Sequence, residues 1–265
     1  MRWPVDRSTI IGILVAIGGI LLGLTLEGGK LAQIVQPTAA LIVFGGTLGA
    51  VLVQCPLPVV IRATKRLKSV FVEPELHPSE TIAQLTSLAF RARREGIIAL
   101  DDELKNVPDD FTRKAVMLAV DGSEPGELRS IMQFEMQARE DQEEETARVY
   151  ESAGGFSPTI GIIGAVLGLI QVMQHLDNID EVGRGIAVAF VATIYGVGAA
   201  NLFFLPVAGK LRTRARNEQV MREMAVEGVV SILEGMNPRM LETKLSGYLA
   251  NQRSVLARNS QRISA

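Results

Sequence analysis

The sequence predicts an all-α, polytopic membrane protein with four transmembrane helices and a helical cytoplasmic insert. Four long apolar runs contain no Asp, Glu, Lys or Arg, and almost all charged residues of the chain lie between or after these runs. Crossing a bilayer core takes about 20 apolar residues, and a charge at the middle of a spanning helix costs about 2.5–3.5 kcal/mol. The sequence between the runs shows no two-residue alternation typical of strands, so the insert is also predicted to be helical.

The apolar runs divide the chain into four parts. The first run begins like a secretory signal, but it is longer than a signal's apolar region and ends without a small-x-small cleavage site, so we interpret it as a retained span. Gly28 and Gly29 turn the chain between the first two spans, which we expect to pack as an antiparallel hairpin. The predicted parts are a transmembrane hairpin at 1–55 (spans 9–26 and 34–53), a cytoplasmic helical domain at 56–153, a transmembrane hairpin at 154–209 (spans 156–174 and 185–208) and a cytoplasmic helical tail at 210–265.

Helix boundaries inside the insert follow from capping residues. Ser79 is expected to cap a helix that Gly96 ends. Asp109 opens the next helix, and Pro125 suits the first turn of a long helix that continues into the third span. The acidic run at 140–145 shows no further pattern and is interpreted as a solvated face.

The basic residues indicate an orientation. Of the 27 Lys and Arg residues, the two short loops at 27–33 and 175–184 carry only Lys30 and Arg184. Cytoplasmic loops carry the excess of Lys and Arg in membrane proteins, so both termini are expected in the cytoplasm. Four basic residues directly after the fourth span are placed to meet anionic lipid headgroups. These residues are Lys210, Arg212, Arg214 and Arg216.

Composition excludes several classes of function. The net charge of -2 argues against binding of nucleic acid by bulk electrostatics. Cys55 is the single cysteine and the two histidines are far apart, so we predict no disulfide, no metal site and no cofactor. Gly196-x-Gly198 lacks a third glycine and follows no strand, and no nucleophile and base stand together, so no enzymatic activity is predicted.

The third and fourth spans hold the candidate functional residues. Pro158 and Pro206 each remove a backbone hydrogen bond and bend a helix. Thr159 and Thr193 supply hydroxyls that can satisfy the freed carbonyls or line a polar path. Any one of them has an ordinary explanation, because both residue types are common in membrane helices, but their matching depths favour a moving or conducting element.

Small residues also recur at helical spacing. Gly19-x-x-x-Gly23, Gly45-x-x-x-Gly49 and Gly164-x-x-x-Gly168 each place two glycines on one helix face, which lets backbones approach closely in lipid. Three copies in four spans indicate dense packing or oligomerisation. The glycines expected to pack helices are Gly161, Gly164, Gly168 and Gly196.

The run AFVATIYGVGAANLFFLP resembles the fourth span of the MotA family of flagellar stator proteins, in which a Thr-x-x-Gly core is followed at fixed spacing by proline. The matching residues are Thr193, Gly196 and Pro206, while Gly198 departs from the aliphatic residue expected there. The resemblance extends over the whole chain, because the third span opens with FSPTIGIIGAVLG and the tail carries GMNPRMLETKL.

This resemblance implies a stator subunit of the bacterial inner membrane that conducts ions with a MotB-like partner and converts the flow into torque. The partner is a single-span, peptidoglycan-binding protein, and family members form a ring of five copies around a partner dimer. No span here holds a carboxylate, so the partner must bring the titrating acid. Thr193 and Thr159 are then expected to line the ion path, and Pro158 and Pro206 to permit the coupled movement.

The resemblance also assigns a rotor contact and an ion. RRxGxxxLD is similar to the segment that meets the rotor protein FliG, with Arg93 as the basic and Asp101 as the acidic contact, although the family more often has Glu at the second position. An ordinary solvated helix end is the alternative interpretation. Ala165 stands where sodium-driven relatives tend to have threonine, which favours H+ and leaves Na+ open.

Two other functions stay open. An ExbB or TolQ type energiser of outer-membrane transport shares the last two spans but usually has three in all, so the four-span count and the tail favour the stator. A secondary transporter or channel predicts internal repeats and its own membrane charges, and the sequence shows neither.

Overall fold

The computed structural model of the chain describes residues 6–72 and 77–248, so residues 249–265 of the predicted tail lie outside the described residues. The chain divides into two compact units. The first, which we call the membrane unit, comprises Met1–Glu75 and Gln142–Arg214. The second, which we call the insert unit, comprises Leu76–Asp141 and Ala215–Ala265.

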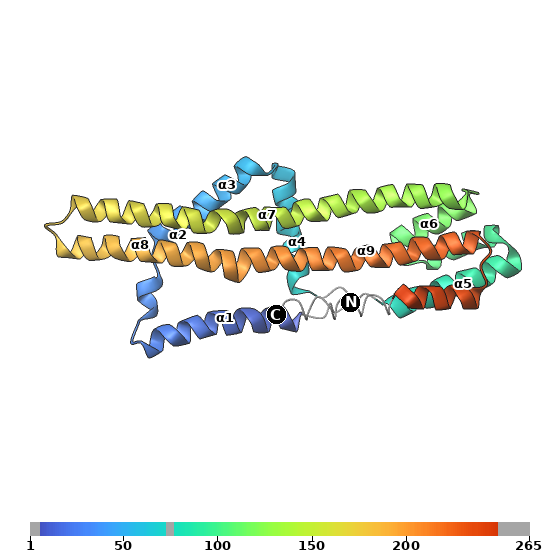
Figure 1. The fold of residues 1–265 in the computed structure, drawn as a ribbon, viewed down its shortest axis with the longest axis horizontal. Coiled ribbons are helices and arrows are strands. Elements are labelled where there is room, and N and C mark those ends of the chain that lie inside the picture. The colour runs from blue at the N-terminus through green and yellow to red at the C-terminus, as the bar shows by residue number, and fades with distance from the viewer. Residues whose placement is uncertain (1–5, 73–76, 249–265) are drawn as a thin grey trace. The chain divides into compact units, whose positions relative to one another are not determined.

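The described residues are almost entirely helical, as Figure 1 shows. Four helical stretches are long and apolar enough to cross a membrane, which confirms the predicted fold class. They are Arg7–Leu26, Leu31–Gln54, Pro125–Gln174 and Ile179–Leu233. The elements in chain order are α1 (Arg7–Leu26), η1 (Leu31–Ile34), α2 (Pro37–Ala40), η2 (Leu41–Gly45), α3 (Gly46–Gln54), α4 (Leu57–Phe71), α5 (Pro78–Glu95), η3 (Ile97–Asn106), α6 (Asp110–Val120), α7 (Pro125–Gln174), α8 (Ile179–Ala199), η4 (Ala200–Phe204) and α9 (Leu205–Leu233).

The first span begins at a side-chain cap and ends at a glycine turn. The Asp6 carboxylate accepts the backbone N–H of Thr9 at 3.1 Å, and Gly28 has a φ of +78°, a left-handed conformation that favours glycine. The backbone N–H of Asp6 donates to the carbonyl of Phe71, so α1 starts against the end of α4. The contacts of α1 lie mainly with α4 and η1, and Figure 1 shows α1 diverging from α2 and α3. The first two spans therefore do not pack along one another as the hairpin that we expected.

The later spans belong to much longer helices. α7 runs without a break from Pro125 through Pro158 to the end of the third span, as predicted. The fourth span continues from α8 through η4, a π-helical turn, into α9, whose second residue is Pro206. A wider π turn before a proline makes room for its ring and for the missing N–H, which explains how the chain stays helical across Pro206.

Capping in the insert unit agrees with the sequence except at one helix start. α5 begins with Pro78 at its first position after His77 as N-cap, so the prediction of Ser79 as the cap is wrong. The fixed φ of proline suits the first helical position and moves the start back by one residue. Gly96 ends α5 with a φ of +89°, and the Asp109 carboxylate caps α6, both as predicted.

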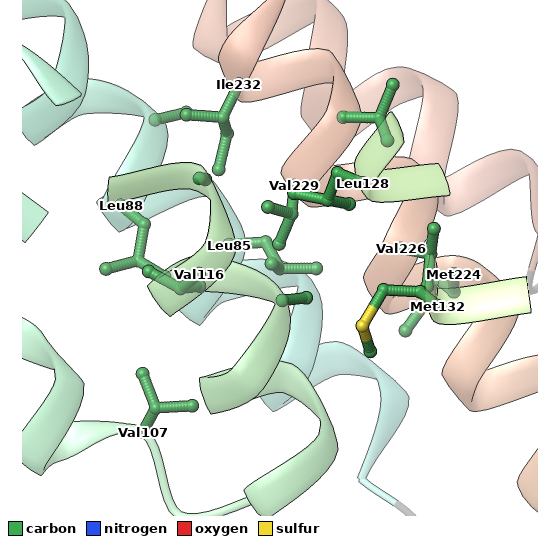
Figure 2. Packing of buried hydrophobic residues seen from close by; sticks show 14 of the residues in the cluster. Leu85, Leu88, Val107, Val116, Leu128, Met132, Met224, Val226, Val229 and Ile232 are labelled. Atoms are coloured by element: carbon green, nitrogen blue, oxygen red, sulfur yellow. The ribbon is translucent and has the colours of Figure 1, made fainter. Parts of the chain in front are cut away.

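The core of the insert unit consists of large side chains from several helices. Figure 2 shows Leu85 and Leu88 of α5 facing Val116 of α6, Leu128 of α7 and Val229 of α9. Leu85, Val116 and Leu128 have no more than a trace of exposed surface. Burying such a side chain contributes about 1.5–3 kcal/mol, so this cluster holds the unit together.

Acidic residues of α7 make contacts that the sequence did not predict. Glu143 accepts the Nε–H of Arg66 of α4 at 3.1 Å, and Glu144 accepts an N–H of Arg212 of α9 at 2.7 Å. The interpretation of the whole run at 140–145 as a solvated face is therefore wrong at these two positions. They join α7 to α4 and α9 inside the membrane unit.

Candidate functional site

Glycines bring the backbones of α7 and α8 into direct contact. A Cβ atom added at Gly161 would lie 2.8 Å from the carbonyl oxygen of Ala192, and one at Gly168 would lie 2.7 Å from that of Gly185. One added at Gly196 would lie 2.6 Å from the carbonyl oxygen of Ser157. No side chain fits at these distances, so glycine sets the separation of the two helices. We call this contact the α7–α8 seam.

The other predicted glycine pairs do not pack inside the chain. Added Cβ atoms at Gly19, Gly23, Gly45 and Gly49 would meet nothing within 4 Å. Gly164 belongs to the seam, because its Cβ would lie 2.8 Å from that of Ala192. Of the three GxxxG patterns, the third alone therefore packs two spans of this chain together.

The seam places Pro158 of α7 beside α8. A Cβ at Gly196 would lie 3.2 Å from the Cα of Pro158, and a Cβ at Gly161 would lie 3.5 Å from the Cα of Thr193. Pro158 and Thr193 are 35 positions apart in the sequence. Pro158 lies beside Gly196 and Thr193 beside Gly161, so the two residues are about one helical turn from each other along the seam.

The two threonine hydroxyls bond to their own helices. Thr193 is half-buried and its hydroxyl donates to the carbonyl of Ala189 at 3.2 Å. Thr159 is exposed and its hydroxyl donates to the carbonyl of Phe156 at 2.8 Å. A hydroxyl that donates in this way keeps its oxygen lone pairs for a second partner. Ala165 is half-buried next to Gly164 and offers no such oxygen.

Pro206 belongs to the same end of the seam as Pro158. A Cβ at Gly154 would lie 2.6 Å from a side-chain atom of Leu205, the residue before Pro206. The side-chain amide of Asn201 in η4 donates to the backbone carbonyl of Val197 in α8 at 2.9 Å. A π turn of this kind is frequent at functional sites of helices.

Tyr195 is a site residue that the sequence reasoning missed. Its hydroxyl donates to the carbonyl of Ile34 at 2.6 Å and accepts the N–H of Gln36 at 3.2 Å. Its ring stacks on Phe44 with 6.0 Å between the centroids. These bonds hold η1 and η2 against α8. A tyrosine inside an apolar span needs a partner for its hydroxyl, and that requirement was the available signal.

The basic residues after the fourth span are largely engaged within the chain. The guanidinium of Arg212 donates to Glu144 at 2.7 Å and to Glu151 at 2.6 Å. Arg214 is buried and donates to Asp6 at 2.7 Å. The expectation that these two arginines face lipid headgroups is therefore wrong.

Asp6 lies at the centre of a buried ionic cluster. Its carboxylate also pairs with Lys210, and Arg214 donates further to the carbonyl of Val72 at 2.5 Å, at the end of α4. Burial by itself raises the pKa of Asp6, but hydrogen bonds from Lys210, Ser8 and the N–H of Thr9 together hold that pKa well below its usual range. The cluster joins the starts of α1 and α9 to the end of α4.

The predicted rotor-contact residues lie on the insert unit. Arg93 is exposed in the last turn of α5, and Asp101 is exposed in η3 on the other side of Gly96. Neither forms an ion pair with another residue in the described parts of the chain. Arg91 instead pairs with Glu103 inside the unit, and the pKa of Glu103 is lowered, first by a hydrogen bond from Asn106 and also by Arg91.

Two family models match the chain. The model described as the MotA/TolQ/ExbB proton channel family matches residues 103–224, and the model for the amino-terminal part of motility protein A matches residues 10–96. The first describes a channel, in agreement with the prediction that the chain is not an enzyme.

Relatives cover nearly the whole chain. Motility protein A of Bacillus subtilis is 36% identical over 92% of this chain and 91% of its own length. Motility protein A of Helicobacter pylori is 34% identical over 92% of this chain and 95% of its own length.

Two solved structures share the fold. The MotAB structure of C. jejuni has a TM-score of 0.87 at 33% identity and covers 92% of this chain and 95% of its own. The flagellar MotAB stator complex from Bacillus subtilis has a TM-score of 0.85 at 36% identity, with 95% and 100% covered. With the fold, the seam and these likenesses together, the chain belongs to the MotA family of flagellar stator proteins, within the MotA/TolQ/ExbB proton channel family.

Proposed function

We propose that this stator subunit forms an ion path together with a MotB-like, single-span partner that binds peptidoglycan, and that it drives rotation of the flagellar rotor. Two similar structures are complexes of MotA with MotB, which supports such a partner. The four apolar runs contain no carboxylate, so the titrating acid of the path comes from the partner.

The α7–α8 seam is the observation that carries this proposal. It brings Pro158 next to Gly196 and Thr193 next to Gly161 through direct backbone contacts. The hydroxyls of Thr193 and Thr159 have lone pairs left to solvate an ion beside the partner's carboxylate. Each charge that crosses releases about 2.3 kcal/mol per 100 mV, which is available for movement of the helices.

We propose H+ as the transported ion, with Na+ as the alternative. Ala165 supplies no oxygen beside the seam, so fewer protein ligands are present to replace the water around Na+. Swimming speed measured with a protonophore tests the assignment, because undiminished speed would exclude H+.

The rotor contact is proposed at Arg93 and Asp101, with FliG as the partner. Both side chains are exposed and unpaired in the described part of the insert unit, one of each sign on either side of Gly96. Complementary charges steer association more than they add affinity. Reversing the charge at Arg93 should therefore lower torque while the complex still assembles in the membrane.

The assembly is proposed to be a ring of five copies around a partner dimer, in the bacterial inner membrane with both termini in the cytoplasm. The charge asymmetry of the loops supports the orientation. The apolar residues of α1, such as Leu14 and Val15, are exposed in the single chain, and they suit contact with lipid or with other copies.

Replacement of Pro206 by leucine tests the coupling. Leucine restores an N–H within the continuous α8–η4–α9 helix, which straightens the π turn. We expect normal assembly with the partner and loss of torque. Pro58→Leu is the matched control. Pro58 lies in the first turn of α4, where a backbone N–H has no carbonyl acceptor within the helix. Normal torque in the Pro206→Leu strain would contradict the proposal.

An ExbB or TolQ type energiser is the second candidate, because the model at 103–224 describes both branches of the family. The match of residues 10–96 to the motility protein A model favours the stator. A deletion strain separates the two. Full filaments without swimming, restored by the gene on a plasmid, support the stator, whereas normal swimming together with defective outer-membrane uptake supports the energiser.

A further inference from the structure

A groove runs along α1 within the membrane unit. Its larger part has a volume of about 640 Å³. One wall is formed by Ile17, Ile20 and Leu21 of α1, and the other includes Ile194, Gly198 and Ala199 of α8. A Cβ added at Gly198 would meet nothing within 4 Å, so this residue leaves the wall open.

A second cavity of about 340 Å³ continues the groove towards the start of α1. Ile13, Ala16 and Leu202 line both cavities, so the two cavities form one continuous groove. From Thr9 to Leu21 the groove follows about 18 Å of helix at 1.5 Å per residue. One leaflet of hydrocarbon is about 15 Å deep. The groove therefore has the depth of a single leaflet.

The end of the groove at the start of α1 is polar and positively charged. Ser8, Thr9 and Lys210 line it, and the Lys210 ammonium donates to both hydroxyls. Lys210 and Arg214 share the one carboxylate of Asp6, so cationic charge remains after this pairing. Both hydroxyls already donate within the chain, Ser8 to Asp6 at 2.6 Å and Thr9 to the carbonyl of Val70 at 3.3 Å, so Lys210 supplies the N–H groups that a phosphate group would accept.

We propose that this groove binds one anionic phospholipid, with its phosphate at Lys210 and an acyl chain along α1. The size of the groove decides against a helix as occupant. A spanning helix about 10 Å across and 30 Å long fills about 2,000 Å³, roughly twice the volume of the two cavities together. An acyl chain is narrow enough for the space, and the charge at the polar end matches an anionic headgroup.

Bound lipid at this place would join α1 to η4 and to the first turn of α9, which contains Pro206. The inference concerns occupancy of the groove and does not rest on ion conduction or torque.

Photo-crosslinking of lipid tests the proposal. The full-length protein is reconstituted with its partner in phosphatidylcholine vesicles that contain phosphatidylglycerol with a diazirine in its acyl chain, and labelled peptides are mapped by mass spectrometry. Ala16→Trp fills the groove, and Val15→Trp is the matched control, because Val15 is 68% exposed and does not line it. We expect labelling near Ile13 and Leu202 that falls about fivefold in Ala16→Trp and is unchanged in Val15→Trp. Gly198→Leu fills the same space from α8 and serves if Ala16→Trp does not fold.

The headgroup is tested with the same photoreactive chain on phosphatidylcholine. We expect the phosphatidylglycerol probe to label more strongly in the wild type, and this preference to disappear in Lys210→Gln, where Arg214 still holds Asp6. Equal labelling in the two tryptophan variants would indicate bulk lipid and overturn the proposal, as would equal labelling by both headgroups. Crosslinks from a photoreactive residue at Ile17 to a second protein chain would identify a helix as the occupant, which also overturns it.

Discussion

The α7–α8 seam and the core of the insert unit hold helices together by opposite means. In the seam, Gly161, Gly168 and Gly196 let one backbone touch another, and the residues that meet them there are small, such as Ala189 and Ala192. In the insert core, Leu85 and Leu128 are buried completely among side chains of several helices (Figure 2).

The difference follows from the solvent of each region. Lipid is as apolar as leucine, so burying leucine between two spans gains little, and close backbone approach provides the attraction instead. In water the same burial contributes about 25 cal/mol per Å². The seam glycines meet mostly backbone atoms and alanine side chains, so fewer bulky side chains interlock there than in the insert core. The part of the chain proposed to move is thus packed by the method that allows movement.

Truncation of Leu85 should produce the largest change in stability. Leu85 is fully buried, and removal of a buried leucine side chain costs about 2–5 kcal/mol. Urea unfolding of the insert unit in the full chain, followed by proteolysis, measures the loss. Phe90→Ala is the control, because Phe90 lies on the same helix but is 49% exposed, and we expect a change below about 1 kcal/mol there. Equal effects of the two substitutions would show that the insert core is not packed as described.

Replacement of Asp6 by asparagine should rank next. It leaves the buried Arg214 without its counter-charge, and loss of one partner of a buried pair costs about 3–5 kcal/mol. Arg214 keeps the carbonyls of Val70 and Val72, so we expect the lower end of this range, about 3 kcal/mol. Thermal unfolding in detergent at pH 7 measures it.

The same variant gives a pH test with a fixed sign. The folded-state pKa of Asp6 lies below its ordinary value of 3.8, so the stabilisation is complete above that value and is lost as the pH falls through the folded-state pKa. The difference between wild type and Asp6→Asn should be constant from about pH 5 to 8 and shrink below about pH 4. A difference that changed between pH 6 and 8 would refute the assignment to this carboxylate.

The spans and most helix ends could be predicted from the sequence because their signals are local. Gly96, Asp109 and Pro125 mark boundaries through their own backbone preferences, and each boundary is found in the structure. Ser79 failed as a cap because Pro78 next to it has the stronger preference for a helix start.

Contacts between distant segments could not be predicted, since local pattern contains no information about them. Asp6 and Arg214 are 208 positions apart, and Glu144 meets Arg212 across 68. Both sets of charges look like solvated residues in the sequence. The same limit applied to the seam, where Gly164-x-x-x-Gly168 packs against α8 while the equally regular Gly45-x-x-x-Gly49 meets nothing within the chain.

Adding one methyl group to the seam should have a smaller effect than either loss above. Gly161→Ala places a Cβ 2.8 Å from a backbone carbonyl that has no rotamer to change, and overpacking of this kind costs about 1–3 kcal/mol. Gly155→Ala is the control, because Gly155 is in the same helix with open space at its Cβ, and alanine should be neutral or stabilise by up to about 1 kcal/mol. Thermal unfolding of the purified complex compares them. If Gly161→Ala and Gly155→Ala changed the stability equally, α7 and α8 would have to lie further apart than the structure places them.

The smallest effect is expected at an ion pair of the insert unit, which sharpens the contrast with Asp6. Arg129 of α7 donates to Glu227 of α9 at 2.7 Å, but its side chain is 41% exposed and Glu227 also pairs with Lys244. Water and Lys244 replace much of what Arg129→Met removes, so we expect a loss below about 1 kcal/mol that shrinks further at high salt. Urea unfolding of this variant at two salt concentrations measures it. A loss as large as that of Asp6→Asn would mean that burial of the charges does not separate the two pairs, and that the insert unit depends on electrostatics as much as on its apolar core.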